Sequence, residues 1–264
     1  MTLSETKKPQ AVAVAGHRGA SGHAPENTLV AFARAKELGA DGIELDVQLS
    51  ADGVPIILHD DTLFRTTNLG QQLRPTELTL ARLKELDAGS WFSPEFAGEK
   101  IPTLEEVFAE FGGKLGLNIE IKSTPGFEAD NGIEQKIAEL VRQYKLEDSA
   151  LISSFDAERL ASLNRYDPGL RLAFIYEFRP DRYPPDFDPI ATAKSFNSVA
   201  LHPSFRIVDR SLVERTHASG LKLNAWTVNE IADMERMVAL GLDTITTNYP
   251  DRLVKLLQHA PKPD

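Results

Sequence analysis

The sequence predicts a single α/β domain, a (β/α)8 TIM barrel with a small insertion after the second strand. Short β-rich apolar runs alternate with helical patterns eight times over most of the 264 residues, and the composition does not change between the two halves. Eight parallel units of this kind suit a closed barrel. An open, doubly wound sheet is the alternative, but no glycine-rich phosphate fingerprint follows the first strand.

The first half of the chain carries clear boundary signals. Asn27 or Thr28 can cap the first helix, and Gly39 ends it. Thr103 can cap a later helix, whose first turn carries two glutamates that suit the positive end of the helix dipole. The strands predicted here are 11–15, 42–49 and 115–121, with an extended piece at 54–58, and the helices are 29–38, 103–111 and 134–144.

The second half repeats the strand–helix unit with short connections. The predicted strands are 150–153, 170–175, 198–201, 221–225 and 244–246, and the helices are 157–165, 189–193, 211–219, 231–240 and 251–257. We expect residues 10–259 to form the barrel, with tails at 1–9 and 260–264. The stretch at about 60–101 is too long for an ordinary βα loop, so it is predicted to be an insertion over one barrel face.

Composition excludes several classes of protein. The chain has 29 Lys and Arg against 39 Asp and Glu, a formal charge of −10. So acidic a surface repels nucleic acid and disfavours stable association with anionic membranes. The absence of cysteine excludes disulfides, a thiol nucleophile and thiolate metal sites. The N-terminus lacks an apolar secretion signal, so the sequence predicts a cytoplasmic protein.

Carboxylates occupy one face of the second and third predicted strands. Glu44 and Asp46 are two residues apart, so they share a face, while the apolar residues between them face the helices. Glu120 has the same position on the next strand. Burying acids without compensation is costly, and a hard cation supplies that compensation with oxygen ligands. We therefore predict a Mg²⁺ or Ca²⁺ site at these three carboxylates.

Two histidines and two cationic side chains stand where strands end. His17 and Arg18 lie between glycines after the first strand, and His59 follows the run at 54–58. Two histidines form the acid–base pair that phosphodiester cleavage needs, and Arg18 can bind a phosphate through two parallel hydrogen bonds. Lys122, one step beyond Glu120, is predicted to hold an anion; a structural ion pair with Glu120 or Asp46 is the alternative.

Other polar and aromatic residues have two plausible roles. Trp226 can wall a small polyol pocket or pack in the core, and His202 can line the barrel mouth or pack. Asn229 is expected to cap a helix and Asn248 to serve as a turn or cap residue. The remaining histidines are expected at the surface; they are His23, His217 and His259.

The motifs together resemble the glycerophosphodiester phosphodiesterase family, in its cytoplasmic bacterial branch. They are His17-Arg18-Gly19, Pro25-Glu26-Asn27-Thr28, Glu44-Leu45-Asp46, His59-Asp60, Asn118-Ile119-Glu120-Ile121-Lys122 and Trp226-Thr227-Val228-Asn229, in the family's order. The resemblance runs from about Val12 to Arg252. Ser123 replaces a proline usual in the family, and Asn248 stands where an aspartate is frequent.

This resemblance implies metal-dependent hydrolysis of glycerophosphodiesters to sn-glycerol 3-phosphate and an alcohol. It implies a divalent metal at Glu44, Asp46 and Glu120, acid–base roles for His17 and His59, and phosphate binding by Arg18 and Lys122. The expected partner is a small-molecule substrate, and the pattern leaves the oligomeric state open. The alternatives are a related phospholipase D-like or phosphoinositide phospholipase barrel, and a phosphodiester-binding barrel without catalysis.

Overall fold

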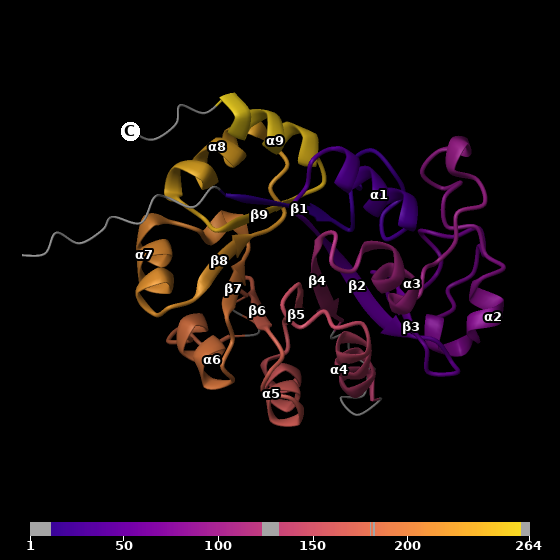
Figure 1. Cartoon of the computed structure of the whole chain (residues 1–264), viewed down its shortest axis with the longest axis horizontal. Helices are drawn as coiled ribbons and strands as arrows, with labels where there is room; N and C mark the ends of the chain where they lie inside the picture. Colours follow the sequence, from indigo (N-terminus) through magenta and orange to yellow (C-terminus); the bar gives the residue numbers. More distant parts are fainter. Residues whose placement is uncertain (1–11, 123–131, 180, 182, 260–264) are drawn as a thin grey trace, which may run out of the picture.

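The computed structural model describes residues 12–122, 132–179, 181 and 183–259. Eight parallel strands form a closed ring, because β1 pairs with β2 on one side and with β9 on the other. The ring order is β1 (Ala13–His17), β2 (Gly42–Leu49), β4 (Gly116–Ile121), β5 (Ala150–Ser154), β6 (Leu172–Tyr176), β7 (Ala200–Pro203), β8 (Lys222–Ala225) and β9 (Thr244–Thr247) (Figure 1). The predicted barrel is therefore confirmed, and the open sheet is excluded.

A helix follows each barrel strand and packs outside the ring (Figure 1). The helices are α1 (Leu29–Glu37), α3 (Leu104–Phe111), α4 (Ile133–Gln143), α5 (Ala157–Tyr166), α6 (Pro189–Ser195), α7 (Arg210–Ala218), α8 (Ile231–Leu240) and α9 (Pro250–His259). Thr28 caps α1 by accepting from the Ala31 amide, and Thr103 forms a capping box with Glu106 at α3. No helix in the described part of the chain has the length and apolar content needed to cross a bilayer.

The segment between β2 and α3 forms the insertion. Its strand β3 (Pro55–Ile57) pairs antiparallel with β2, so the extended piece predicted at 54–58 is a hairpin arm beside the barrel. The rest contains α2 (Leu80–Leu83), the short 3₁₀ turns η1 (Pro75–Glu77) and η2 (Pro94–Phe96), and much irregular chain. A separate apolar cluster holds it together; its buried members are Ile56, Leu58, Leu63, Leu83, Ala88 and Ile101.

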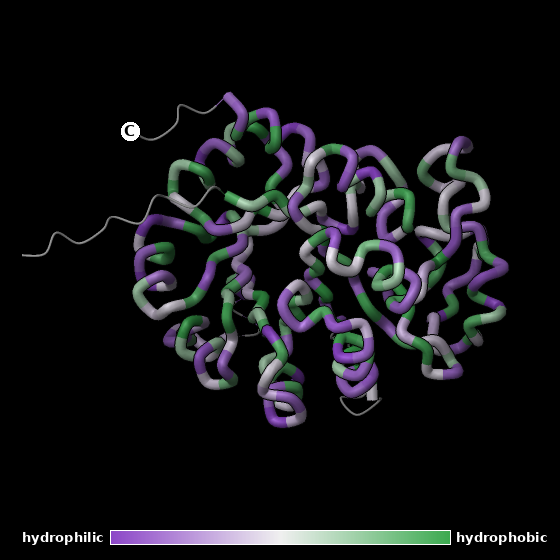
Figure 2. The backbone as a smooth tube through the Cα atoms, in the orientation of Figure 1, coloured by the Kyte–Doolittle hydropathy of each residue, from purple (hydrophilic) through white to green (hydrophobic). Residues whose placement is uncertain are grey.

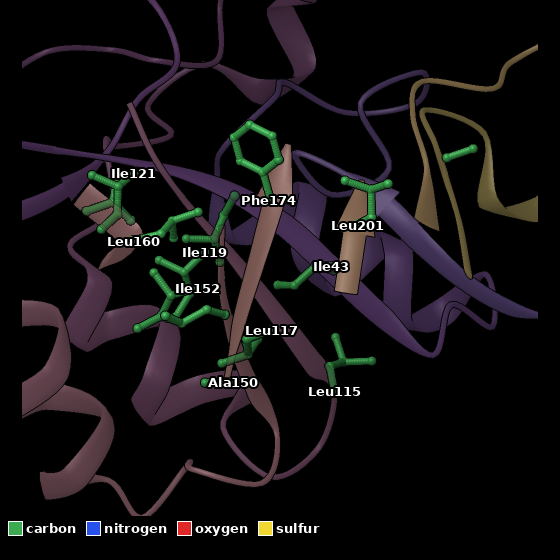
Figure 3. Close-up of a cluster of buried hydrophobic side chains, with 14 of the residues drawn as sticks. Ile43, Leu115, Leu117, Ile119, Ile121, Ala150, Ile152, Leu160, Phe174 and Leu201 are labelled. Carbon is green, nitrogen blue, oxygen red and sulfur yellow. The ribbon is translucent and has the colours of Figure 1, made fainter. Parts of the chain in front are cut away.

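The main hydrophobic core lies between the strands and the helices, outside the barrel lumen. Ile43, Leu45 and Val47 alternate with the β2 carboxylates and are at most 1% exposed. Figure 3 shows the same outward layer on neighbouring strands, including Ile119 and Ile152. Figure 2 shows hydrophilic and hydrophobic residues alternating along the helices, as expected for helices with one face on a sheet.

Candidate active site

The predicted site residues gather at the C-terminal ends of the barrel strands. Parallel strands in a ring direct these ends to one face, so residues distant in sequence meet there. His17 is the last residue of β1, two residues beyond the predicted strand end, and Glu44 and Asp46 lie in β2. The others are Arg18 after β1, His59 after β3, Glu120 and Lys122 at the end of β4, and Trp226 after β8.

The three predicted carboxylates converge. In the register of β2 with β4, Asp46 is directly opposite Glu120. One oxygen from each of Glu44, Asp46 and Glu120 lies within 4.8 Å of the other two. Burial, with Asp46 and Glu120 close by, raises the pKa of Glu44 well above its usual value, and burial also raises the pKa of Glu120. The three groups therefore favour a bound positive charge.

These carboxylates fit a divalent cation. Glu44 Oε1 is buried and, among the residues that the structure describes, has no hydrogen-bond partner. Carboxylate oxygens are the ligands that Mg²⁺ and Ca²⁺ prefer. A cation held by the three groups would satisfy the orphaned oxygen and offset their mutual repulsion.

Two cationic side chains border the carboxylate cluster. Lys122 Nζ lies 2.9 Å from Glu120 Oε1 and 3.3 Å from Asp46 Oδ1. Arg18 Nε lies 3.3 Å from Asp46 Oδ2. Although burial raises the pKa of Asp46, the charges of Lys122 and Arg18 outweigh it and hold that pKa far below its usual value. Lys122 thus makes the ion pairs of the structural alternative with both Glu120 and Asp46, and its anion-binding role stays a prediction.

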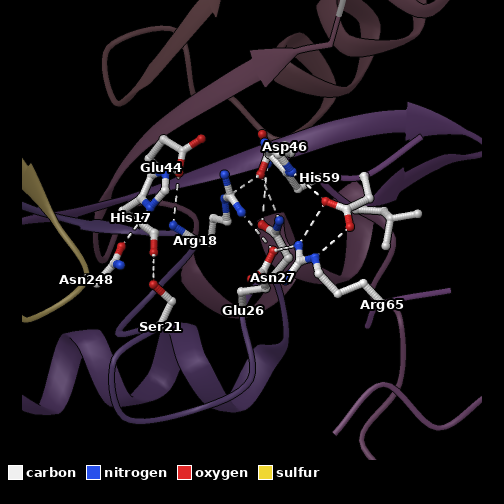
Figure 4. A network of polar contacts seen from close by, with 12 residues as sticks. His17, Arg18, Ser21, Glu26, Asn27, Glu44, Asp46, His59, Arg65 and Asn248 are labelled. Atoms are coloured by element: carbon white, nitrogen blue, oxygen red, sulfur yellow. Dashed lines mark hydrogen bonds and ion pairs between the residues drawn. The ribbon is translucent and has the colours of Figure 1, made fainter. Parts of the chain in front are cut away.

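The backbone of Arg18 also takes part in the site. Its φ of 55° lies in the left-handed region, and its amide donates to Glu44 Oε2 at 2.9 Å. The guanidinium Nη1 donates to Glu26 Oε1 at 2.8 Å, so the loop after β1 anchors the side chain (Figure 4). The side chain is 17% exposed, which leaves it accessible to a small ligand.

Asn248 orients the His17 imidazole. The His17 Nδ1 atom lies 2.7 Å from Asn248 Oδ1 (Figure 4). An amide oxygen only accepts, so Nδ1 carries the proton and Nε2 keeps its lone pair. Burial, followed by the charge of Arg18, lowers the pKa of His17 to about 4. The ring is therefore neutral near pH 7, and its Nε2 can accept a proton.

His59 has an anionic partner instead. Its Nδ1 atom donates to Asp60 Oδ1 at 2.7 Å (Figure 4). Burial raises the pKa of Asp60, but the hydrogen bonds from His59 and Arg65 outweigh this effect and hold the pKa well below its usual value. Asp60 therefore stays ionised and holds the His59 ring through this hydrogen bond. The two histidines thus differ in the charge of the group behind them.

Arg65 of the insertion joins both halves of this network (Figure 4). It donates to Glu26 from Nη1 and Nη2 at 2.8 and 2.7 Å, and to Asp60 from Nε and Nη2 at 2.6 and 2.8 Å. Glu26 in turn holds Arg18, and Asp60 holds His59. One insertion residue therefore fixes the spacing between a cation and a histidine.

Trp226 and His202 border a small central cavity. Its lining residues are His17, Glu44, Asn118, Glu120, Ile175, His202, Asn224, Trp226 and Thr246. The indole of Trp226 donates to the His202 carbonyl oxygen at 2.8 Å, and Phe155 packs edge-on against it. Burial lowers the pKa of His202 to about 3, so it is neutral at physiological pH. His202 is thus both buried and part of the cavity lining.

Three minor expectations need correction. Asn229 does not cap α8, whose N-cap is Glu230; its side chain instead accepts from the Asn248 amide at 3.0 Å. Asn248 was expected to serve as a turn or cap residue, but its side chain also bonds to His17 Nδ1 at 2.7 Å. His23 is 33% exposed and bonded to Asp251 at 2.7 Å, because the start of α9 reaches the first loop.

Sequence reasoning did not predict the hydrogen bonds that Arg65 and Asn248 make in the site. Asn248 directly follows the last barrel strand, at the end where site residues gather, and this position was the available signal. Arg65 lies in an irregular segment without periodicity, so nothing local to it indicated a role.

Comparison with known proteins agrees with this geometry. Residues 17–252 match the glycerophosphoryl diester phosphodiesterase family. A glycerophosphodiester phosphodiesterase of Caldanaerobacter subterraneus is 42% identical over 246 residues, which cover 93% of this chain and 97% of that relative. A glycerophosphodiester phosphodiesterase of Bacillus subtilis is 34% identical, covering 94% of this chain and 87% of that relative.

Solved structures share the architecture. An Oleispira antarctica phosphodiesterase, solved in complex with the product sn-glycerol-3-phosphate, is 33% identical and has a TM-score of 0.81. The match covers 95% of this chain and 97% of that one. A glycerophosphodiester phosphodiesterase from Agrobacterium tumefaciens is 28% identical with a TM-score of 0.79, covering 92% and 99% of the two chains.

Proposed function

Because the chain belongs to the glycerophosphoryl diester phosphodiesterase family and is a phosphoric diester hydrolase, we propose how its own residues perform the reaction. A divalent cation is held by Glu44, Asp46 and Glu120, and His17 and His59 form the acid–base pair. The products are sn-glycerol 3-phosphate and an alcohol. The observation that carries this proposal is the carboxylate cluster, within 4.8 Å, beside two oriented histidines.

The cation is Mg²⁺ or Ca²⁺, since its ligands are carboxylate oxygens. When bound, it supplies Lewis-acid polarisation of a phosphoryl oxygen and orients the glycerol hydroxyls. The orphaned Glu44 Oε1 and the raised pKa of Glu44 support its presence in the working enzyme.

His17 is the general base in this account. Its Nε2 lone pair is free, because Asn248 accepts the Nδ1 proton. It takes a proton from the nucleophile, which is water or the neighbouring glycerol hydroxyl of the substrate. His59 is the general acid and donates a proton to the leaving alcohol, while its hydrogen bond to Asp60 holds the ring in place.

Arg18 and Lys122 stabilise the charge that develops on the phosphoryl oxygens. Both lie within 3.3 Å of Asp46, so the phosphate would meet two fixed cations at the edge of the carboxylate cluster. Trp226 follows β8 at the same end of the barrel and walls the glycerol. The product bound in the Oleispira antarctica relative supports this choice of substrate.

A product assay tests the proposed function. Wild-type protein is incubated with glycerophosphodiesters that differ in their alcohol, and with matched lysophospholipids that carry an acyl chain. We expect sn-glycerol 3-phosphate from the glycerophosphodiesters and little turnover of the lysophospholipids. Preferential turnover of the acylated compounds would indicate the phospholipase alternative, and substrate binding without product would indicate a barrel without catalysis.

A further inference from the structure

The lumen of this barrel is hollow at the N-terminal ends of the strands. In most (β/α)8 barrels, layers of bulky branched side chains fill the interior. Here small residues face the lumen at this end, and they border a cavity of about 270 Å³, which we call the lower cavity. The small residues are Ala13, Gly42, Gly116 and Ala200.

The lower cavity reaches the catalytic centre. Asn118, His202 and Asn224 border it, and the same three residues border the central cavity beside His17 and Glu44. One layer of polar side chains therefore stands between the two spaces. The central cavity has about 20 Å³, which is room for about one water molecule.

The exposure of residues along β4 indicates that the lumen is open at the N-terminal ends of the strands. Gly116 is exposed, and Asn118 and Glu120, which share its face, are half-buried. Leu117 and Ile119, on the opposite face, are at most 1% exposed. The inner face of β4 is thus more accessible than its outer face, the reverse of what a packed lumen would give.

The polar layer is built to bind water. Asn118 Oδ1 is buried and lacks a hydrogen-bond partner among the described residues. The Asn224 side chain accepts from Thr246 at 3.0 Å and lies 3.5 Å from His202 Nδ1. Buried polar atoms in a polar cavity of sufficient size are normally satisfied by ordered water.

Charged residues form the rim of the lower cavity. Lys222 pairs with Asp243 at 2.6 Å, and Arg171 donates to the Asp148 carbonyl oxygen at 2.7 Å. The rim also contains Asp41, which accepts from the Val14 amide at 2.8 Å, so charged and hydrophilic groups surround the entrance. Water is the ligand that suits such an entrance.

We propose that the lower cavity is a water-filled second entrance to the catalytic centre, through the layer of Asn118, His202 and Asn224. This inference rests on the proposed hydrolysis. Each diester consumes one water: its oxygen forms the new bond to phosphorus, one proton passes to a histidine, and the alkoxide released from phosphorus takes a proton from the other. Substrate occupies the C-terminal mouth, and water arrives from the opposite end.

Gly116 permits a direct test. A Cβ at Gly116 would meet only the Asp41 carbonyl oxygen at 3.7 Å and Gly42 Cα at 3.8 Å, which are ordinary contacts. Because Gly116 borders the lower cavity, the longer side chain of Gly116→Leu would extend into that space. Gly116→Ala is the matched control, because its methyl group leaves most of the space open.

We expect Gly116→Leu to lower kcat by about tenfold with KM unchanged, while Gly116→Ala stays near the wild type. Wild-type kcat in a folded Gly116→Leu protein whose cavity is filled in a crystal structure would overturn the proposal. The wild-type crystal structure is an independent test if Gly116→Leu fails to fold. Solvent density from Gly116 to Asn118 supports the entrance, and a dry cavity or a bound organic molecule there refutes it.

This test separates the two proposals. The solvent structure of the lower cavity does not depend on the substrate, so it can be measured whatever the protein hydrolyses. An enzyme that releases no sn-glycerol 3-phosphate contradicts the proposed function, whereas an active enzyme with a dry lower cavity contradicts the second entrance alone.

Discussion

Asn248 Oδ1 lies 2.7 Å from His17 Nδ1, although the two residues are 231 positions apart in the sequence. His17 ends β1 and Asn248 follows β9, and these two strands pair to close the barrel. The closure of the ring therefore sets the tautomer of the imidazole. The contact links the fold to the chemistry more directly than any other pair in the site.

Asn248→Asp should shift the pH dependence of catalysis. With asparagine, the pKa of His17 is about 4, so the ring is neutral and able to accept a proton above that pH. An anion at Nδ1 favours the imidazolium and raises this pKa. Hence, as the pH is lowered, kcat should begin to fall at a higher pH in Asn248→Asp than in the wild type. The measurement is kcat against pH; superimposable acid limbs would argue against His17 as the base.

Either histidine should be essential to turnover. His17→Ala and His59→Ala should each lower kcat by about 10²-fold or more, since each removes one proton-transfer group. Far-UV circular dichroism should remain unchanged. His259→Ala, in the exposed last turn of α9, is the control and should leave kcat unaltered. A histidine variant in the site that keeps wild-type activity would remove that residue from the mechanism.

Arg65→Lys should disturb the site although it keeps the charge. Lysine has one nitrogen and cannot form the four hydrogen bonds with which Arg65 joins Glu26 and Asp60. We expect kcat/KM to fall by about tenfold, with a lower Tm. Arg82→Lys, an exposed pair with Glu85 in the same insertion, is the matched control. If the two variants have the same kcat/KM and Tm, Arg65 is a surface residue without a role in the site.

Lys122→Met should separate cation binding from catalysis. Lys122 pairs with two of the three proposed cation ligands, so its removal should strengthen Mg²⁺ or Ca²⁺ binding in calorimetric titrations. At the same time kcat should fall by about 10²-fold, because one cation facing the phosphate is lost. Glu120→Gln should instead weaken cation binding. If Lys122→Met binds the cation more weakly than the wild type, the ligand assignment is wrong.

Much of this site follows from short-range sequence pattern. The period of two residues in a strand places Glu44 with Asp46, and the barrel pattern places Glu120 on the adjacent strand. The capping residue Thr103 and the insertion follow from local signals as well. Each of these inferences needs only the geometry of one strand, one helix end or one pair of neighbours.

The rest depends on contacts between distant segments. The register that sets Asn248 beside His17 arises only when β9 meets β1, and the position of Arg65 depends on how an irregular insertion folds back over the barrel. Asn229 illustrates the same limit: it has a good capping side chain, but the N-cap of α8 is Glu230, and the Asn229 side chain accepts from the distant Asn248 amide instead. The hollow lumen likewise depends on the inward residues of several strands together, including Gly42 and Gly116.

Cation removal and restoration test the central claim most directly. Release of sn-glycerol 3-phosphate from a glycerophosphodiester is followed before and after treatment with EDTA, and again after Mg²⁺ or Ca²⁺ is added back. A cation held by Glu44, Asp46 and Glu120 predicts that activity disappears with EDTA, returns with the added ion, and does not return in Glu44→Gln. Undiminished hydrolysis by the metal-free protein would contradict the account.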